Sequence, residues 1–291
     1  MTRIAHLSDI HFGANDPKIV RATEAWLEKR RPDLVIISGD FTQRARVEQF
    51  REASAYLNRL RGMGLKVLGI PGNHDVPLYD LFRRFGAPLH RYKRFIDSEL
   101  CPWFEDDDIA VLGLNTARSL AIKGGRINRE QIAMMRERFA SVAASKTRIL
   151  VTHHPLYAIP IGEGGEIAEA VGRHDDAVKA ACAAGVHIAL AGHFHRTYAE
   201  AASRMVETTG TALVIQAGTT STRLRNDEPQ SFNWLHVADQ EVALQVIAWD
   251  GASFRDGNES RFRFDGGWTP AEEPGVARAA NIARHIGAYA G

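Results

Sequence analysis

The sequence contains very little cysteine. Among its 291 residues, only Cys101 and Cys182 are cysteines. Because they show no Cys-x-x-Cys spacing, they argue against a zinc knuckle and against the disulfide framework of small secreted domains. We therefore expect both to be reduced thiols buried inside the protein.

Long hydrophobic runs are also missing. No stretch of about 18 apolar residues occurs, so the sequence predicts no membrane-spanning helix and no membrane partner. The first residues, MTRIAHLSDIHFG, lack the apolar core and the small-residue cleavage site of a secretory signal. A cytoplasmic location is the resulting expectation.

The sequence has no large excess of charge of either sign. Its 36 Lys and Arg residues nearly balance its 35 Asp and Glu residues, which gives a formal net charge of +1. This balance argues against a strongly basic face that binds nucleic acid. We therefore expect no nucleic-acid partner, whereas a homo-oligomer remains possible.

Histidine, by contrast, has an unusual distribution. Six of the twelve histidines fall in four short motifs, SDIHFG, GNHD, THHP and AGHFH. These six are His11, His74, His153, His154, His193 and His195. Their clustering is the strongest functional signal in the sequence.

Short runs rich in Val, Ile and Leu predict buried strands, and amphipathic stretches between them predict helices. Predicted strands and helices alternate over the first two-thirds of the chain, which indicates β-α units and mostly parallel strand pairing. In the last third, predicted strands follow one another, which favours antiparallel hairpins. We expect two packed sheets with helices outside. Strands are predicted near 4–9, 34–40, 66–73, 109–115, 148–154, 187–193, 212–218, 232–239 and 242–250, and helices at 17–31, 46–64, 128–142 and 174–185.

One domain is expected over residues 1–268, followed by a tail at 269–291 that ends in a weak helix. Two stretches interrupt the alternation, the aromatic residues 76–108 and the glycine-rich residues 156–173. Long connections without clear structure often serve as lids or binding loops. We predict cap-like insertions at both places, with ordinary surface loops as the equal alternative.

Five predicted strands end in side chains that can bind a cation. In open α/β sheets the ligand crevice lies beyond the carboxyl ends of the strands, so these side chains should converge. Asp-x-His and His-x-His pairs, if extended, also point both side chains to one face. The oxygen and nitrogen donors suit Mn, Fe, Co, Ni or Zn, and their number favours two ions bridged by a carboxylate. They are Asp9, His11, Asp40, Asn73, His74, Asp75, His153, His154, His193 and His195.

In this order, the motifs DIH, GD, GNHD, HHP and GHFH resemble the calcineurin-like metallophosphoesterase superfamily. The resemblance covers roughly residues 3–196 and is strongest to bacterial class III cyclic nucleotide phosphodiesterases and their glycerophosphodiesterase relatives. It implies an α/β fold, a four-layer αββα sandwich with two mixed β-sheets. It also implies two divalent or mixed-valence metal ions (Mn, Fe, Zn or Co), and a phosphodiesterase that cleaves cyclic nucleotides or other small phosphodiesters by attack of metal-activated hydroxide.

The resemblance implies a ligand set for each ion. The first ion would be bound by Asp9, His11 and His195. The second would be bound by Asn73, His153 and His193.

Four further residues acquire roles beside those ligands. Asp40 would bridge the two ions, and His74 would stay off the metals and approach the leaving oxygen of the substrate. Gly72 is expected to allow a sharp turn, and Asp75 to orient a neighbouring imidazole or backbone group.

Other polar residues have weaker support. His154 is expected to face either the substrate or the loop, and His6 the core or the surroundings of the site. Four arginines could hold phosphate, but structural or surface roles are favoured for them. They are Arg44, Arg118, Arg223 and Arg225.

The same motifs allow other functions. A repair-type DNA exonuclease is disfavoured by the near-neutral charge, and a non-catalytic scaffold by the complete ligand set. A phosphomonoesterase stays open, because the metal ligands do not distinguish monoesters from diesters.

Overall fold

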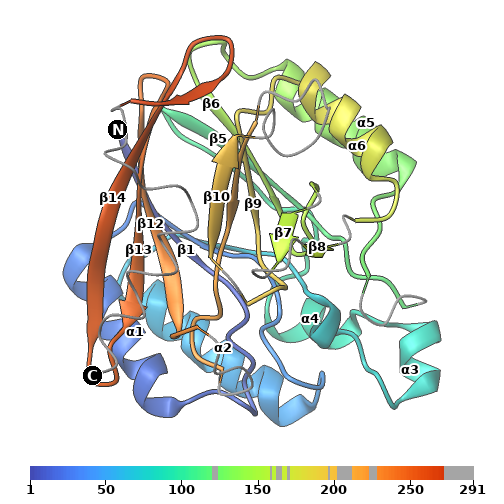
Figure 1. Ribbon diagram of the computed structural model, residues 1–291. Helices are drawn as coiled ribbons and strands as arrows, with labels where there is room; N and C mark the ends of the chain where they lie inside the picture. The colour runs from blue at the N-terminus through green and yellow to red at the C-terminus, as the bar shows by residue number, and fades with distance from the viewer. Residues whose placement is uncertain are drawn as a thin grey trace.

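Two β-sheets pack face to face between two layers of helices in the computed structural model (Figure 1). The structure describes residues 1–119, 124–157, 159–161, 166–168, 171–195, 197–201, 212–222 and 228–271. The predicted αββα sandwich with two mixed sheets is confirmed.

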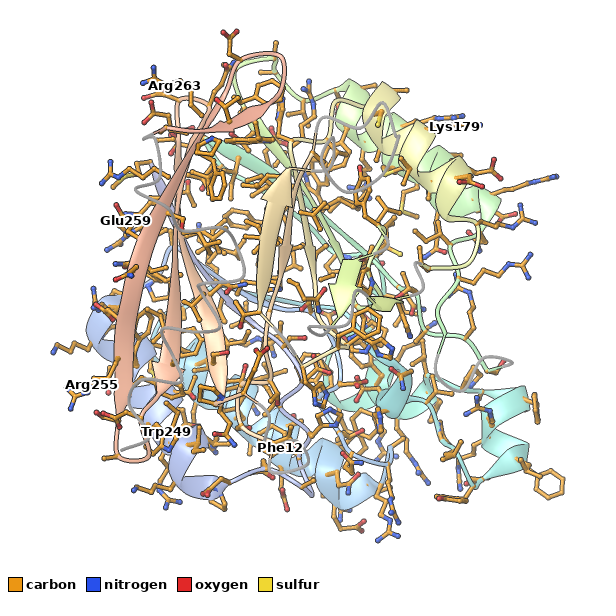
Figure 2. The ribbon with its side chains drawn as sticks, in the orientation of Figure 1. Phe12, Lys179, Trp249, Arg255, Glu259 and Arg263 are labelled. Carbon is orange, nitrogen blue, oxygen red and sulfur yellow. The ribbon has the colours of Figure 1, made fainter. Side chains whose placement is uncertain are left out.

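The first sheet has seven strands in the order β15-β14-β13-β12-β1-β2-β3. Its N-terminal strands run parallel, and its C-terminal strands form antiparallel hairpins with charged side chains projecting along β14 (Figure 2). The strands are β1 (Thr2–Leu7), β2 (Leu34–Ile37), β3 (Val67–Gly69), β12 (Ser231–Ala238), β13 (Glu241–Trp249), β14 (Phe254–Phe264) and β15 (Trp268–Pro270).

The second sheet has six strands in the order β10-β11-β9-β6-β5-β4. Its four inner strands are parallel, and each edge strand is antiparallel to its neighbour. The strands are β4 (Trp103–Glu105), β5 (Ile109–Leu114), β6 (Thr147–Thr152), β9 (Ile188–Ala191), β10 (Tyr198–Ala201) and β11 (Leu213–Gln216), and a separate antiparallel pair consists of β7 (Ile159–Ile161) and β8 (Glu166–Ala168).

Helices cover the outer face of each sheet (Figure 1). Those on the first sheet are α1 (Pro17–Arg30), α2 (Val47–Gly62) and α4 (His90–Phe95), and those on the second are α5 (Arg129–Ala140) and α6 (His174–Ala183). A 3-10 turn, η1 (Asn73–Asp75), follows β3, and the short helix α3 (Leu81–Gly86) follows η1.

Alternation along the buried strands builds the layers. In β2, Leu34 and Ile36 belong to the apolar cluster between the sheets, whereas Val35 and Ile37 belong to the cluster beneath the helices. Successive side chains of a strand point to opposite faces, so a strand apolar at every position is buried on both faces. The continuous apolar runs of the sequence follow from this double burial.

The start of α1 shows how local sequence sets an element. The Asp16 side chain accepts a hydrogen bond from the amide of Lys18, and Pro17 occupies the first helical position, where no amide donor is needed. Ile19, Val20 and Leu27 then face the core. The helix is thus fixed by its cap and by its apolar face.

The residues 76–108 are not one uniform loop. Leu89, Tyr92 and Ile96 belong to the core beneath the first sheet, and β4 joins the second sheet. By contrast, the segment from Leu78 to Phe85 is largely exposed. Only the first part of this predicted insertion therefore lies apart from the layers.

Other expectations have mixed outcomes. Both cysteines are free, as predicted, but they are half-buried rather than fully buried. Among the described helices none is long and apolar enough to cross a membrane. Strand β15 continues to Pro270, two residues past the predicted boundary at 268, and the tail beyond residue 271, with its expected helix, lies outside the described residues.

Candidate metal centre

The polar motifs meet beyond the carboxyl ends of the central strands, as predicted. Asp9 follows β1 and Asp40 follows β2, and the two loops run side by side. The amide of Asp9 donates to the carbonyl of Gly39 at 3.1 Å, and that of His11 donates to the carbonyl of Asp40 at 3.0 Å. Loops distant in sequence are therefore joined by backbone hydrogen bonds.

The motif residues are not extended, and that part of the expectation is wrong. Asp9, His11, Asp40, His193 and His195 have φ angles of 52°, 54°, 52°, 79° and 56°. This left-handed region is uncommon for non-glycine residues and costs about 1–3 kcal/mol for each. The side chains converge because tight loops turn them inward.

One group of potential metal-binding side chains gathers around Asp9. Nε2 of His195 lies 3.1 Å from Oδ1 of Asp9 and 3.1 Å from Nε2 of His11. The other oxygen of Asp9 accepts from the Ser8 hydroxyl at 2.5 Å and from the amide of His193 at 2.9 Å. Asp9 thus keeps one oxygen directed at the two imidazoles.

A second group gathers around His153. Its Nε2 lies 3.0 Å from Oδ1 of Asn73 and 3.4 Å from Oδ2 of Asp40. The same Asp40 oxygen lies 3.6 Å from Nε2 of His11. Asp40 therefore stands between the two groups.

His154 also turns toward this second group. Ligand atoms of His153, His154 and His193 all lie within 4.8 Å of one another, and Nδ1 of His154 lies 2.8 Å from the hydroxyl of Thr116. His154 is buried beside the cluster rather than placed on an outer loop.

The donor set fits a pair of cations. Nitrogen and oxygen ligands about 2 Å from one ion are separated from each other by about 3 to 4 Å. The distances around Asp9 and around Asp40, from 3.1 to 3.6 Å, match that spacing. Imidazoles and carboxylates are ligands of Zn, Mn, Fe and Co.

Hydrogen bonds behind the imidazoles fix which ring nitrogen faces the centre. Nδ1 of His153 donates to the carbonyl of Ser38 at 2.7 Å, and Nδ1 of His74 donates to the carbonyl of Gln43 at 2.8 Å. In each neutral ring Nε2 is therefore the basic nitrogen. His6, 2.9 Å from the Ser38 hydroxyl, supports the same backbone, as the sequence allowed.

The protonation states prepare the site for cations. Burial raises the pKa of Asp40, but His153 and the other nearby histidines lower it more, so this carboxyl stays ionised. Burial lowers the pKa of His153, yet Asp40 raises it to about 9, which favours the protonated imidazole until a bound cation displaces the proton. Burial and then His153 lower the pKa of His193 to about 4, which leaves that ring neutral.

Two glycines allow Asp40 and His153 to approach the neighbouring backbone closely. The chain does turn at Gly72, whose carbonyl accepts from the amide of Asp75, but its φ of −103° is one that any residue can adopt. A Cβ there would lie 2.1 Å from Oδ1 of Asp40. Gly39 has a left-handed φ of 103°, and a Cβ on it would lie 2.4 Å from Nδ1 of His153.

Asp75 holds the loops together from beneath. Its buried carboxylate accepts from the amides of Phe41, Thr42 and Gly72 and from the Thr42 hydroxyl, at 2.9 to 3.2 Å. Of the two expected roles, the structure shows the orientation of backbone groups.

We expect Asp75→Ala to lower the free energy of unfolding by about 3 kcal/mol, because four donors lose a buried acceptor. Urea denaturation of the metal-free protein measures this loss. The exposed Asp107→Ala is the matched control and should change stability by less than about 0.5 kcal/mol. Equal losses of stability for the two substitutions would contradict the role of Asp75 in holding the loops together.

Several supporting residues were missed by the sequence interpretation. Ser8, Ser38, Thr42 and Gln43 act through a hydroxyl or a carbonyl, and their only sequence signal is adjacency to a ligand motif. Among the weaker candidates, Arg118 donates to backbone carbonyls and to Gln131, which is the structural role expected.

Two candidate arginines cannot be placed and one lies at the surface. Arg223 and Arg225 lie outside the described residues. Arg44 is exposed, and its guanidinium lies 5.8 Å from the ring centroid of Tyr79.

Comparison with models of protein families identifies the family of this chain. Residues 2–197 match the family model of the calcineurin-like phosphoesterases, which spans every residue of the cluster described above. The chain belongs to the calcineurin-like phosphoesterase family. This family uses a dinuclear metal centre, and the two groups of donors correspond to such a centre.

Relatives within the family carry phosphodiesterase names. The chain is 22% identical over 249 residues to a probable cyclic nucleotide phosphodiesterase of Synechococcus, covering 78% of this chain and 83% of that protein. It is 36% identical over 83 residues to the glycerophosphodiester phosphodiesterase GpdQ of Enterobacter lignolyticus, which covers 25% of this chain and 29% of that one.

Solved structures share the fold at low identity. The purple acid phosphatase PPD1 of yellow lupin superposes with a TM-score of 0.67 at 14% identity, covering 88% of this chain and 52% of that one. A dimetal phosphatase of Danio rerio gives 0.62 at 12% identity, covering 91% and 99%. These similarities establish the calcineurin-like fold.

Proposed function

We propose that this calcineurin-like phosphoesterase is a dinuclear metal-dependent phosphodiesterase acting on cyclic nucleotides or other small phosphodiesters. The observation that carries the proposal is the position of Asp40, whose Oδ2 lies within 3.6 Å of Nε2 of both His11 and His153. A carboxylate placed in this way can serve two cations at once.

Each group of donors would hold one ion. Asp9, His11 and His195 are assigned to the first ion, and Asn73, His153 and His193 to the second, with Asp40 shared by both. The ions are drawn from Mn, Fe, Zn and Co. When bound, they supply a nucleophile at neutral pH and neutralise charge on the phosphoryl oxygens.

The chain itself would handle the leaving group. His74 lies beside His11, with ring centroids 4.8 Å apart, and its amide donates to Oδ1 of Asp40 at 2.8 Å. Because Nδ1 donates to Gln43, Nε2 is the ring nitrogen that can face the substrate, and the doubly protonated ring would give its Nε2 proton to the departing oxygen. His74 is therefore assigned as the general acid rather than as a ligand.

Preference for diesters is supported by the names of the relatives. The Synechococcus protein is named a probable cyclic nucleotide phosphodiesterase, and GpdQ a glycerophosphodiester phosphodiesterase. The first matches most of this chain at low identity, and the second matches a short segment at higher identity.

We expect protein loaded with Mn²⁺ to hydrolyse bis(p-nitrophenyl) phosphate, and chelated protein to be inactive, because the reaction needs the cation pair. Release of p-nitrophenol measures turnover. A panel of cyclic AMP, 2′,3′-cyclic nucleotides, glycerophosphodiesters, DNA ends and phosphomonoesters then identifies the substrate class. Faster cleavage of monoesters or of DNA ends than of every small diester would overturn the proposal.

A further inference from the structure

The exposed apolar residues of the structure are concentrated in one short segment. Phe82 is 94% exposed, Tyr79 74%, Leu81 60%, Phe85 59% and Leu78 37%. Elsewhere in the described part of the chain, Met1 is the one exposed large hydrophobic residue. We call the segment from Leu78 to Phe85 the α3 patch.

The α3 patch stands outside the layered body. Figure 1 places α3 at the lower right edge of the molecule, beyond α4. Just after it, Leu89 and Tyr92 are buried in the core. Since a contiguous exposed apolar patch on a protein surface marks an interaction site, α3 presents a face suited to a partner.

The same stretch is basic, although the whole chain is almost neutral. Residues 76–96 contain a single acidic residue, Asp80, which is engaged by Arg83. Of their cations, Arg83, Lys93 and Arg94 are exposed, whereas Arg91 is half-buried and Arg84 is buried. The net charge of the whole chain is +1, so this local excess is balanced by acidic residues elsewhere in the chain.

The α3 patch also borders the candidate metal centre. The Tyr79 ring lies 5.8 Å from the guanidinium of Arg44, and Arg44 directly follows Gln43, whose carbonyl accepts from His74. A partner on the α3 patch would therefore lie near Gln43 and His74.

We propose that the α3 patch docks on the surface of an anionic lipid bilayer. Exposed Phe, Leu and Tyr side chains flanked by Lys and Arg form the combination that enters the headgroup region of such a membrane. A second copy of the chain fits less well, because a two-fold pairing would bring two basic segments together. The expectation of no membrane partner rested on the absence of a membrane-spanning segment. Docking on the surface of a bilayer does not require such a segment.

Cosedimentation of the metal-loaded chain with vesicles tests this proposal. Phosphatidylcholine vesicles with about a third phosphatidylglycerol should bind the protein, and pure phosphatidylcholine vesicles should bind it much less. Phe82→Asp should lower the partition coefficient about tenfold, and Lys93→Glu about threefold. Lys179→Glu, on α6 far from α3 (Figure 2), is the matched charge control and should change binding by less than about twofold.

Binding is read without catalysis, so the result is independent of the proposed phosphodiesterase activity. Phe82→Asp should leave turnover of a soluble diester unchanged. Equal binding to both vesicle types, or undiminished binding of Phe82→Asp, overturns the proposal. The proposal is also overturned if the wild-type chain does not bind vesicles and instead forms a dimer in sedimentation velocity that Phe82→Asp dissociates.

Discussion

Replacing Asp40 by alanine is expected to abolish both metal pairing and phosphoester hydrolysis. Asp40 is the carboxylate between the two groups of donors, and it also accepts from the amide of His74. Its loss removes a negative charge from a buried site in which His153 and His11 both approach the same oxygen. Stabilisation by a cation pair contributes several kcal/mol to such reactions, so turnover should fall about a thousandfold or more.

Metal content by elemental analysis and turnover of bis(p-nitrophenyl) phosphate measure the two effects together. Asp40→Asn preserves the shape and removes only the charge, so it should also lose the metal pair while the fold, followed by circular dichroism, is retained. Asp33 precedes β2 at its other end and forms a half-exposed ion pair with Arg3. Asp33→Ala is therefore the matched control, with both ions retained. Wild-type turnover in Asp40→Ala would refute the bridging assignment.

His74→Ala is expected to keep both metal ions and to slow turnover by about 10²- to 10⁴-fold, the usual contribution of a general acid. The loss should be larger for an alkyl leaving group than for p-nitrophenolate, because only the alkoxide needs a proton as it departs. The structural reason is that Nδ1 of His74 donates to the carbonyl of Gln43, so only Nε2 can contact the leaving group of the substrate.

Comparison of two substrates with different leaving groups, at saturating metal, measures this selectivity. The exposed His90 on α4 is the control, and His90→Ala should leave both rates and both metals unchanged. If His74→Ala loses metal in proportion to activity, His74 is a ligand. If the rates for good and poor leaving groups fall equally, His74 does not donate the proton.

Sequence patterns determined the layers and the identity of the clustered residues. Runs such as LVII and ILVT are apolar at nearly every position, and such runs predict strands buried on both faces. The positions of Asp9, Asp40 and His153 at strand ends followed from the general rule for ligand crevices in open sheets. Both inferences depend only on the spacing of apolar residues and on the order of the motifs along the chain, and the sequence contains this information completely.

Only the tertiary structure decided how these residues reach one another. The left-handed backbone at Asp9 and Asp40 is held by hydrogen bonds between separate loops, so no local pattern signals it. For the same reason the sequence did not show why glycine is required at position 72, since the constraint is a carboxylate thirty-two residues earlier in the chain.

The stretch 76–108 shows the same division. Its aromatic and apolar residues look alike in sequence, yet Tyr92 is buried beneath the first sheet, whereas Phe82 faces solvent. Burial depends on what the rest of the chain packs against a side chain. The sequence by itself therefore determined the fold class, the residues that cluster beyond the strand ends and the family resemblance. The three-dimensional packing decided which residues support that cluster and which apolar side chains remain exposed.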